Sequence, residues 1–395
     1  MGVRHEVITD PARLSRLHPA WESLLERASS NDPTNAPFWQ ETWWETFGAL
    51  DGRKLRNIAF FEGERLVGLA PLLSRWHWYK PGIPLRRLEL VASGEPAAHE
   101  ICSEYNGVIV ERGLERSIAQ AFVQALRDPQ MGDWDELELP LLPGDVPMVE
   151  ALRAALCEAG HPAAVAIEST APYIPLPRSW DCYISQLSSQ SRYLINRSLR
   201  DLETWAGGEL IYTRAETRDE LANGSFILRN LHSERWSGAD EKGGAFSSSL
   251  FRSFHEQASL QLLERGALEL SWLSVRGEPI AALYNFAWNN KIYHYQSGRR
   301  LDLPRSVRAG IAIHAFAIRR AIERGLREYD FLGGEARYKQ QLSLAERPLL
   351  CLSATRKPVV ALAQKVARRG LNGARAVHRR LREMWKPSGT VSDVR

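Results

Sequence analysis

Near the end of the chain, a short apolar run gives way to two glycines and a group of ionisable residues. The stretch YDFLGGEARYKQQ carries Asp330, Glu335, Tyr338 and Lys339. Strands that end in glycines and charged side chains are where α/β proteins often carry their chemistry. A carboxylate can take a proton, and an ammonium can stabilise negative charge that develops on a reacting oxygen. The stretch therefore predicts a catalytic site, and the alternative interpretation is a strand followed by a solvated loop.

Two other stretches carry candidates for the same site. On the predicted strand KIYHYQSG, His294 and Gln296 share one face and Tyr295 lies on the other. His294 is a candidate general base, and the alternative is a half-buried histidine with ordinary partners. On the predicted helix ILRNLHSERW, His232 and Arg235 are three positions apart and therefore share a face. Tyr295, His232 and Arg235 are candidates for substrate binding.

Basic residues also mark two helix starts. RSVRAGIAIHAFAIRR predicts a helix directly after a strand, with Arg305, Arg308 and Gly310 at its beginning. The free N–H groups of a helix N-terminus bind phosphate groups. In SSQSRYLINRSLRDLE, Arg192 begins a group of three arginines that suits an anionic substrate, although two acidic residues that follow could neutralise the group.

Composition limits the class of protein. The chain has 395 residues, 44% hydrophobic and 25% charged, which predicts two globular domains. It contains no run of about twenty apolar residues and no signal-peptide pattern at the N-terminus, so we expect a cytoplasmic protein. The four cysteines, Cys102, Cys157, Cys182 and Cys351, lie far apart without clustered histidines. Their spacing indicates buried, inert thiols, with neither a metal site nor a disulfide.

The predicted helices and strands follow one plan twice. Each half has helices, a hairpin with a short polar turn, another helix and a strand, as in FFEGERLVGLAPL and SVRGEPIAALYNF. The proline-rich stretch APYIPLPRSW reads as a connector between the halves. We therefore predict an α/β fold with domains at residues 1–170 and 171–355, and a duplication as the structural hypothesis.

The remaining residues, 356–395, form a basic tail. They contain eleven Lys and Arg against two acidic residues, while the rest of the chain is mildly acidic. Apolar residues recur at three- and four-residue steps, which predicts a basic amphipathic helix. Such a helix suits an anionic membrane surface, an acidic partner or RNA, and the alternative is a helix packed on the body of the protein.

The residues from GALELSWLSVRGEPIAALYNF to IERGLREYDFLGGEARYK resemble the C-terminal half of the GNAT acyltransferase superfamily. They look most like cellulose-biosynthesis-associated acetyltransferases, whose relatives are the Fem-type aminoacyl transferases. The resemblance covers roughly residues 20–355. It implies tandem GNAT-like domains, each a mixed central sheet flanked by helices, with the second domain catalytic and the first a degenerate copy that helps to form an acceptor cleft.

This resemblance also implies a reaction. An acyl group would pass directly from acyl-CoA, typically acetyl-CoA, to an amine or hydroxyl of a small-molecule, sugar or cell-envelope acceptor, without a metal or a covalent enzyme intermediate. Lys339 would hold a phosphate or stabilise the oxyanion, and Arg235 would contact a phosphate of the acceptor. Asp330 would be a base or an anchor for the acceptor amine, and the alternative is a buried structural partner.

One position departs from the GNAT pattern. Arg308 stands where the first glycine of the pyrophosphate loop is expected, and of the two small residues only Gly310 fits. A side chain at this position opposes close approach of the phosphate to the backbone. The departure keeps two alternatives open: a Fem-type transferase that uses aminoacyl-tRNA, with the tail as an RNA contact, and a non-catalytic scaffold in exopolysaccharide assembly that sits at the inner membrane through its tail.

Overall fold

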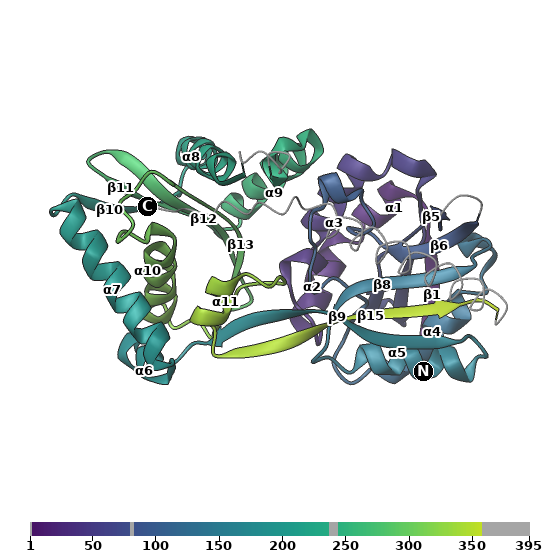
Figure 1. Cartoon of the computed structure of the whole chain (residues 1–395). Helices are drawn as coiled ribbons and strands as arrows, with labels where there is room; N and C mark the ends of the chain where they lie inside the picture. Colours follow the sequence, from purple (N-terminus) through teal and green to yellow (C-terminus); the bar gives the residue numbers. More distant parts are fainter. Residues whose placement is uncertain (1, 80–82, 237–243, 358–395) are drawn as a thin grey trace, which may run out of the picture.

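The computed structural model describes residues 2–79, 83–236 and 244–357. The predicted tail lies outside the described residues from residue 358 onward. Figure 1 shows two lobes, the first half of the chain on one side and the second half on the other, with two long strands running between them. None of the helices in the described part of the chain is long and apolar enough to cross a membrane.

The first half alternates strands and helices. Its elements are β1 (Arg4–Ile8), α1 (Pro11–Ser15), α2 (His18–Arg27), α3 (Pro37–Phe47), β2 (Lys54–Leu55), β3 (Asn57–Glu62), β4 (Arg65–Ala70), β5 (Leu72–Trp78), β6 (Pro84–Leu90), β7 (Ile109–Val110), α4 (Glu115–Ala125), β8 (Glu136–Pro143), α5 (Met148–Glu158) and β9 (Ala163–Pro175).

The second half has a closely similar order. Its elements are α6 (Trp180–Gln186), α7 (Ser189–Ala206), β10 (Leu210–Arg214), α8 (Arg218–Trp236), α9 (Ser249–Glu264), β11 (Leu268–Val275), β12 (Glu278–Trp288), β13 (Lys291–Arg299), α10 (Ala309–Glu323), β14 (Glu328–Asp330), α11 (Arg337–Leu342) and β15 (Ala345–Thr355). Thus β6, α4 and β8 of the first half correspond in order to β13, α10 and β14 of the second.

The predicted hairpins of the second half are confirmed. Arg276 and Gly277 join β11 to β12, and Asn289 and Asn290 join β12 to β13. All four residues have positive φ, between 46° and 80°. Gly and Asn tolerate this conformation best, and two-residue turns with positive φ match the twist of paired strands.

Most strands belong to one mixed sheet. Eleven strands follow the order β10-β11-β12-β13-β14-β9-β15-β8-β6-β5-β2, and four more form a smaller sheet, β1-β3-β4-β7. Neighbours in the large sheet are antiparallel except at β13/β14 and β6/β8, which are parallel. The parallel pairing with β13 covers the whole of β14, which ends at Asp330, so β13 runs on to Arg299 with no strand partner on this side among the described residues.

Each half of the chain gives its last strand to the sheet of the other half. β9 pairs with β14, and β15 pairs with β8, while β9 and β15 pair with each other in the centre. The first part of the expected connector belongs to the sheet instead, because Pro172 and Pro175 lie within β9. Pro172 takes part through its carbonyl, which accepts from the N–H of Phe331 at 3.0 Å, a role that needs no proline N–H. The division at residue 170 falls inside this strand and stays a prediction.

Three apolar clusters hold the layers together. α4 and α5 pack on the first half of the large sheet, and α6, α7, α10 and α11 pack on one face of the second half. The third cluster joins α2 and α3 to α8 and α9 across the two halves. At its centre Trp39, which is fully buried, contacts the rings of Phe254 at 4.9 Å and Phe286 at 5.6 Å. The two halves thus share a core, which keeps the site between them in a fixed geometry.

Candidate active site

A cavity opens where β13 runs on beyond the end of β14. Its volume is about 480 Å³, and its wall is formed by the end of β13, residues 299–308, and the first turns of α10. Tyr338 of α11 and His314 of α10 lie at its inner end. The edge of β13 beyond β14 presents unpaired backbone N–H and C=O groups along the wall, which an extended amide-bearing ligand could pair.

The outer end of the cavity is built to hold an anion. α10 begins after Arg308 without a side-chain cap and without an acidic residue in its first turn. The N–H groups of Ala309 and Gly310 have no acceptor among the described residues. A free helix N-terminus of this kind attracts phosphate groups.

Arginines surround this helix start. Arg300 is paired with Asp302, whereas the guanidinium groups of Arg299, Arg305 and Arg308 have no ion-pair partner in the described part of the chain. All three lie at the surface beside the cavity. Arg308, the residue that departs from the glycine pattern, is exposed at the cap, so its side chain adds positive charge at the cavity rim.

The inner end of the cavity is lined by aromatic and imidazole groups. The Tyr338 hydroxyl lies 3.1 Å from Nε2 of His294, and the Tyr338 ring stacks on His314 at 5.1 Å. Burial lowers the pKa of His294 well below its ordinary value, and the neighbouring His314 lowers it further. His294 is therefore neutral at physiological pH and serves Tyr338 as a hydrogen-bond partner.

A second wall of the site comes from the first half of the chain. Residues 91–108, between β6 and β7, cross to the end of β14. There the Tyr105 hydroxyl donates to Asp330 at 2.7 Å, and the N–H of Gly333 donates to Oε1 of Glu104 at 3.3 Å. A Cβ at Gly333 would lie 3.1 Å from the same carboxylate oxygen, so glycine permits this approach. The crossing brings the carboxylate of Glu104 to the backbone just beyond the end of β14.

The backbone of this crossing segment is strained. Ala92, Cys102 and Tyr105 have φ values of 62°, 51° and 65°. Non-glycine residues rarely adopt this region, and such residues cluster at functional sites where the surrounding structure holds them in place.

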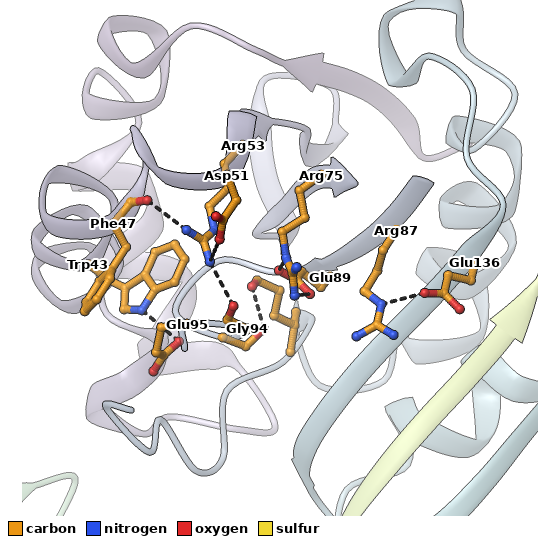
Figure 2. Close-up of polar contacts among 12 residues, drawn as sticks. Trp43, Phe47, Asp51, Arg53, Arg75, Arg87, Glu89, Gly94, Glu95 and Glu136 are labelled. Atoms are coloured by element: carbon orange, nitrogen blue, oxygen red, sulfur yellow. Dashed lines mark hydrogen bonds and ion pairs between the residues drawn. The ribbon is translucent and has the colours of Figure 1, made fainter. Parts of the chain in front are cut away.

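Buried polar contacts supply that support (Figure 2). Arg53, whose side chain is fully buried, donates to the carbonyl of Gly94 at 2.8 Å. The indole of Trp43 donates to Glu95 at 3.2 Å, and the other carboxylate oxygen of Glu95 accepts from the N–H of Ile101 at 2.7 Å. These contacts fix both ends of the turn that precedes Glu104.

Buried ion pairs accompany the parallel strands of the first half. Two ion pairs, Arg75–Glu89 at 2.5 Å and Arg87–Glu136 at 2.7 Å, lie beside the parallel strands β6 and β8 (Figure 2). Both carboxylates are almost completely buried. Residues 91–108 then leave this end of the sheet for the second half. The first half therefore contributes a wall to the site of the second.

Glu104 and Lys339 are the two charged groups at the junction of the walls. Glu104 is 8% exposed, and its Oε2 has no partner among the described residues. Burial raises the pKa of Glu104 to about 7, against the opposing charge of Lys339. Burial likewise lowers the pKa of Lys339, while Glu104 and Asp330 oppose that change. The ammonium of Lys339 donates to the carbonyls of Leu332 and Gly333, which holds it at the end of β14.

Asp330 anchors the end of β14 within the core. It is fully buried, one oxygen accepts from Tyr105, and the other accepts from the N–H of Leu332 at 2.7 Å. Leu332 has a φ of 56°, which this bond supports. Burial raises the pKa of Asp330 to about 6, and the charge of Arg347 opposes that change. Of the two predicted roles, the geometry favours a buried structural partner.

The other predicted residues lie at varied distances from this junction. Glu335 is exposed, in agreement with the solvated-loop interpretation. The Tyr295 hydroxyl donates to the carbonyl of Ile101 and lies 2.8 Å from His255, so it holds the crossing segment. Arg192 donates to the carbonyl of Ser185 at 3.2 Å, and no contact of the described residues joins it to Lys339.

α8 carries the last two predicted residues. His232 is buried against Phe246, and its backbone packs closely on Gly298 of β13, where a Cβ would lie 2.7 Å from its N atom. Arg235 belongs to α8, but its side chain lies outside the described residues. The expectation of buried cysteines is wrong, because Cys102, Cys157 and Cys182 are exposed and Cys351 is partly exposed. Cys102 lies in a loop, Cys157 and Cys182 lie on helices, and Cys351 lies in β15.

Glu104 was not predicted from the sequence. It stands in ICSEYNG, a stretch without helical or strand periodicity and far from Lys339 along the chain. The available signal was a glutamate between Ser103 and Tyr105, shortly before a buried strand, and such a pattern is common on protein surfaces. His314 was missed for a related reason, because it lies in the apolar face of a helix.

We expect Glu104→Gln to stabilise the protein at pH 8 more than at pH 4. The pKa of Glu104 is raised in the folded state, so its contribution to stability is present below about pH 4 and is lost as the pH rises through about 7. The gain at pH 8 should be on the order of 2 kcal/mol. Urea unfolding at both pH values measures it, with the exposed neighbour Glu100→Gln as control. An equal effect at the two pH values would contradict the buried, uncompensated carboxylate.

Comparison with known proteins agrees with this geometry. The family model of the acetyltransferase (GNAT) domain matches residues 189–340, which include the cavity, Tyr338 and Lys339. No curated protein matches the chain. The predicted subgroup of cellulose-biosynthesis-associated acetyltransferases therefore stays a prediction.

Three solved structures share the fold. FemX is 11% identical, with 87% of this chain and 96% of that chain covered and a TM-score of 0.57. A conserved protein of unknown function from Bacteroides thetaiotaomicron VPI-5482 is 10% identical, with 86% and 97% covered and a TM-score of 0.53. The C-terminal domain of a putative lysylphosphatidylglycerol synthetase from Agrobacterium fabrum is 10% identical, with 89% and 95% covered and a TM-score of 0.51.

These findings define the class of fold. The chain has an α/β fold with a large mixed sheet flanked by helices, as in FemX, and residues 189–340 match the model of the acetyltransferase (GNAT) domain. The predicted fold class is confirmed.

Proposed function

We propose that the protein is an acyltransferase that moves an acyl group from acyl-CoA to an amine or hydroxyl acceptor. The donor occupies the cavity between β13 and α10. Its acyl group reaches the junction of Tyr338 and Lys339, and the acceptor approaches from the side of residues 101–105. The acceptor belongs to the small-molecule, sugar or cell-envelope class.

One observation carries the proposal. The cavity of about 480 Å³ joins an uncapped helix N-terminus, beside three arginines without an ion-pair partner among the described residues, to the neutral Tyr338 and His294 pair at its other end. A phosphate-bearing donor with a long, mostly neutral arm matches this change of polarity along its length.

The reaction needs one base and one acid. The acceptor nitrogen or oxygen attacks the thioester carbonyl, and Glu104 takes its proton, because a carboxyl with a pKa of about 7 is half ionised at neutral pH. Lys339 stabilises the negative charge on the carbonyl oxygen. When the C–S bond breaks, the phenol of Tyr338 gives its proton to the leaving thiolate. The new C–N or C–O bond then replaces the C–S bond.

The predicted donor-site residues provide the test. Arg308→Glu places a negative charge at the start of α10 and should weaken acetyl-CoA binding by about 10-fold or more, as expected for charge repulsion at a phosphate site. Isothermal titration calorimetry measures the affinity. Arg116→Glu is the matched control, because it makes the same change on an exposed residue in the first turn of α4. An equal loss of affinity in both variants would show that the donor does not bind at the start of α10.

A second candidate is aminoacyl transfer from tRNA. Arg308 in place of the usual glycine and the structural likeness to FemX favour it. In this case the basic tail contacts RNA, and removal of residues 358–395 abolishes tRNA binding. Acetyl-CoA then has no effect on the protein, with or without these residues. The scaffold at a membrane surface is distinguished by the same deletion, which would then release the protein from anionic vesicles.

A further inference from the structure

A chain of hydrogen bonds runs behind the donor cavity and joins two histidines. It passes from the Tyr338 hydroxyl to Nε2 of His294 (3.1 Å), from Nδ1 of His294 to Oδ1 of Asn285 (2.8 Å), from Nδ2 of Asn285 to the Tyr329 hydroxyl (3.3 Å), and from there to Nδ1 of His314 (3.2 Å). All members except Tyr338 are buried. Because Tyr338 and His314 both line the cavity, the chain begins and ends at its wall.

Each imidazole in this chain carries a single proton. Burial lowers the pKa of His314 to about 3, and it lowers the pKa of His294 well below its ordinary value. A neutral imidazole has one donor nitrogen and one acceptor nitrogen. The position of each proton is therefore set by the hydrogen bonds that the ring makes.

Asn285 sets the direction of every bond. Its Oδ1 only accepts, so His294 carries its proton on Nδ1 and accepts from Tyr338 through Nε2. Its Nδ2 only donates, so the Tyr329 hydroxyl accepts from Asn285. The buried Tyr329 hydroxyl has no other acceptor for its own proton among the described residues, so it donates to Nδ1 of His314. His314 must then carry its proton on Nε2.

The Nε2 of His314 has no hydrogen-bond partner in the described part of the chain, although the ring forms part of the cavity wall. The stacking of the ring on Tyr338, with 26° between the planes, keeps this edge of the imidazole in place. The cavity therefore meets a neutral N–H donor beside the phenol.

We propose that His314 binds the donor by donating a hydrogen bond from Nε2–H to a carbonyl oxygen, and that Asn285 and Tyr329 position it by fixing its tautomer. The inference rests on the proposed acyl-CoA donor. Two kinds of carbonyl fit this chemistry: the carbonyl of the thioester and the amide carbonyls of the pantetheine arm. Acetyl-CoA has both kinds and CoA has only the amides, so the two ligands distinguish them.

Affinity measurements test the contact. His314→Phe keeps an aromatic ring but removes the donor, and it should weaken acetyl-CoA binding roughly 3- to 10-fold, the usual worth of one hydrogen bond. An equal loss for CoA assigns the bond to a pantetheine amide, and an unchanged affinity for CoA assigns it to the thioester. Wild-type affinity of His314→Phe for both ligands overturns the proposal.

The tautomer is tested without any ligand. Two-bond ¹H–¹⁵N correlation spectra of protein labelled in histidine should show His314 protonated on Nε2, with the signal assigned from its absence in His314→Phe. In Asn285→Asp the carboxylate accepts from both His294 and Tyr329, so Tyr329 no longer donates to His314. We expect His314 to move its proton to Nδ1, and the affinity for acetyl-CoA to fall as in His314→Phe, although residue 285 makes no contact with the cavity.

Two outcomes separate this inference from the proposed function. If wild-type protein binds neither acetyl-CoA nor CoA, the donor assignment fails while the spectra still decide the tautomer. If both ligands bind and His314 is protonated on Nδ1, the inference fails alone. Tyr329→Phe serves where Asn285→Asp does not fold, because it removes the hydroxyl that selects the tautomer and should produce a mixture of the two forms.

Discussion

Glu104→Gln should lower kcat by about 100-fold or more, the usual contribution of a general base, while leaving the affinity for acetyl-CoA unchanged. Glu104 has an unpartnered oxygen at the junction of the two walls, and its pKa of about 7 places it near the operating pH. Glutamine keeps the size and the bond from Gly333 but cannot take a proton. Steady-state release of CoA thiol with an active acceptor measures the effect.

The pH profile separates a base from a positioning group. In the wild type, kcat/KM should rise through about pH 7 as Glu104 ionises, and this limb should be lost in Glu104→Gln. Glu100 is an exposed neighbour in the same segment. The variant Glu100→Gln should retain both the wild-type kcat and the rise of kcat/KM through about pH 7. A fully active Glu104→Gln variant with an unchanged pH profile would show that another group takes the proton.

Lys339→Met should have the second large effect, a loss of about 100-fold to 1,000-fold in kcat. An ammonium that faces developing negative charge is worth this much in sites from which water is excluded. The variant also removes the positive charge that lowers the pKa of Glu104. The rising limb of the pH profile should therefore move above about pH 7, which a merely structural lysine would not cause.

Arg337→Met is the control for Lys339. It removes a cation from the same short helix, but its side chain is exposed. We expect wild-type kcat and an unmoved pH profile for Arg337→Met. If Lys339→Met folds and turns over at the wild-type rate, Lys339 does not take part in catalysis and the charge on the carbonyl oxygen must be stabilised by another group.

The sequence predicted the second half well because its signals are local. In the Arg276-Gly277 and Asn289-Asn290 turns, Gly277 and both asparagines are residue types that tolerate positive φ, and the strands between the turns have regular apolar patterns. The alternation along β13 correctly placed His294 on the face opposite Tyr295. The helix start at Arg308 was also visible, because the residue types change abruptly there from polar to apolar.

What the sequence could not show is how the two halves exchange strands and share a site. β9 reads as a strand followed by prolines, and only its pairing with β14 and β15 makes the proline segment part of the sheet. The crossing of residues 91–108 depends on tertiary contacts such as Arg53 with Gly94 and Tyr105 with Asp330. No periodicity in the sequence encodes such contacts. Lys339 could therefore be predicted as a site residue from the sequence, whereas Glu104 could not.

Hydrogen exchange with and without acetyl-CoA tests the central claim most directly. If the donor binds where we propose, backbone amides in residues 298–311 and 329–339 become protected, while those of α4 and β6, the counterparts in the first half, do not change. The protected amides should include Ala309 and Gly310, which have no acceptor among the described residues. Protection confined to other segments, or none at saturating acetyl-CoA, would contradict an acyl-CoA site between β13 and α10.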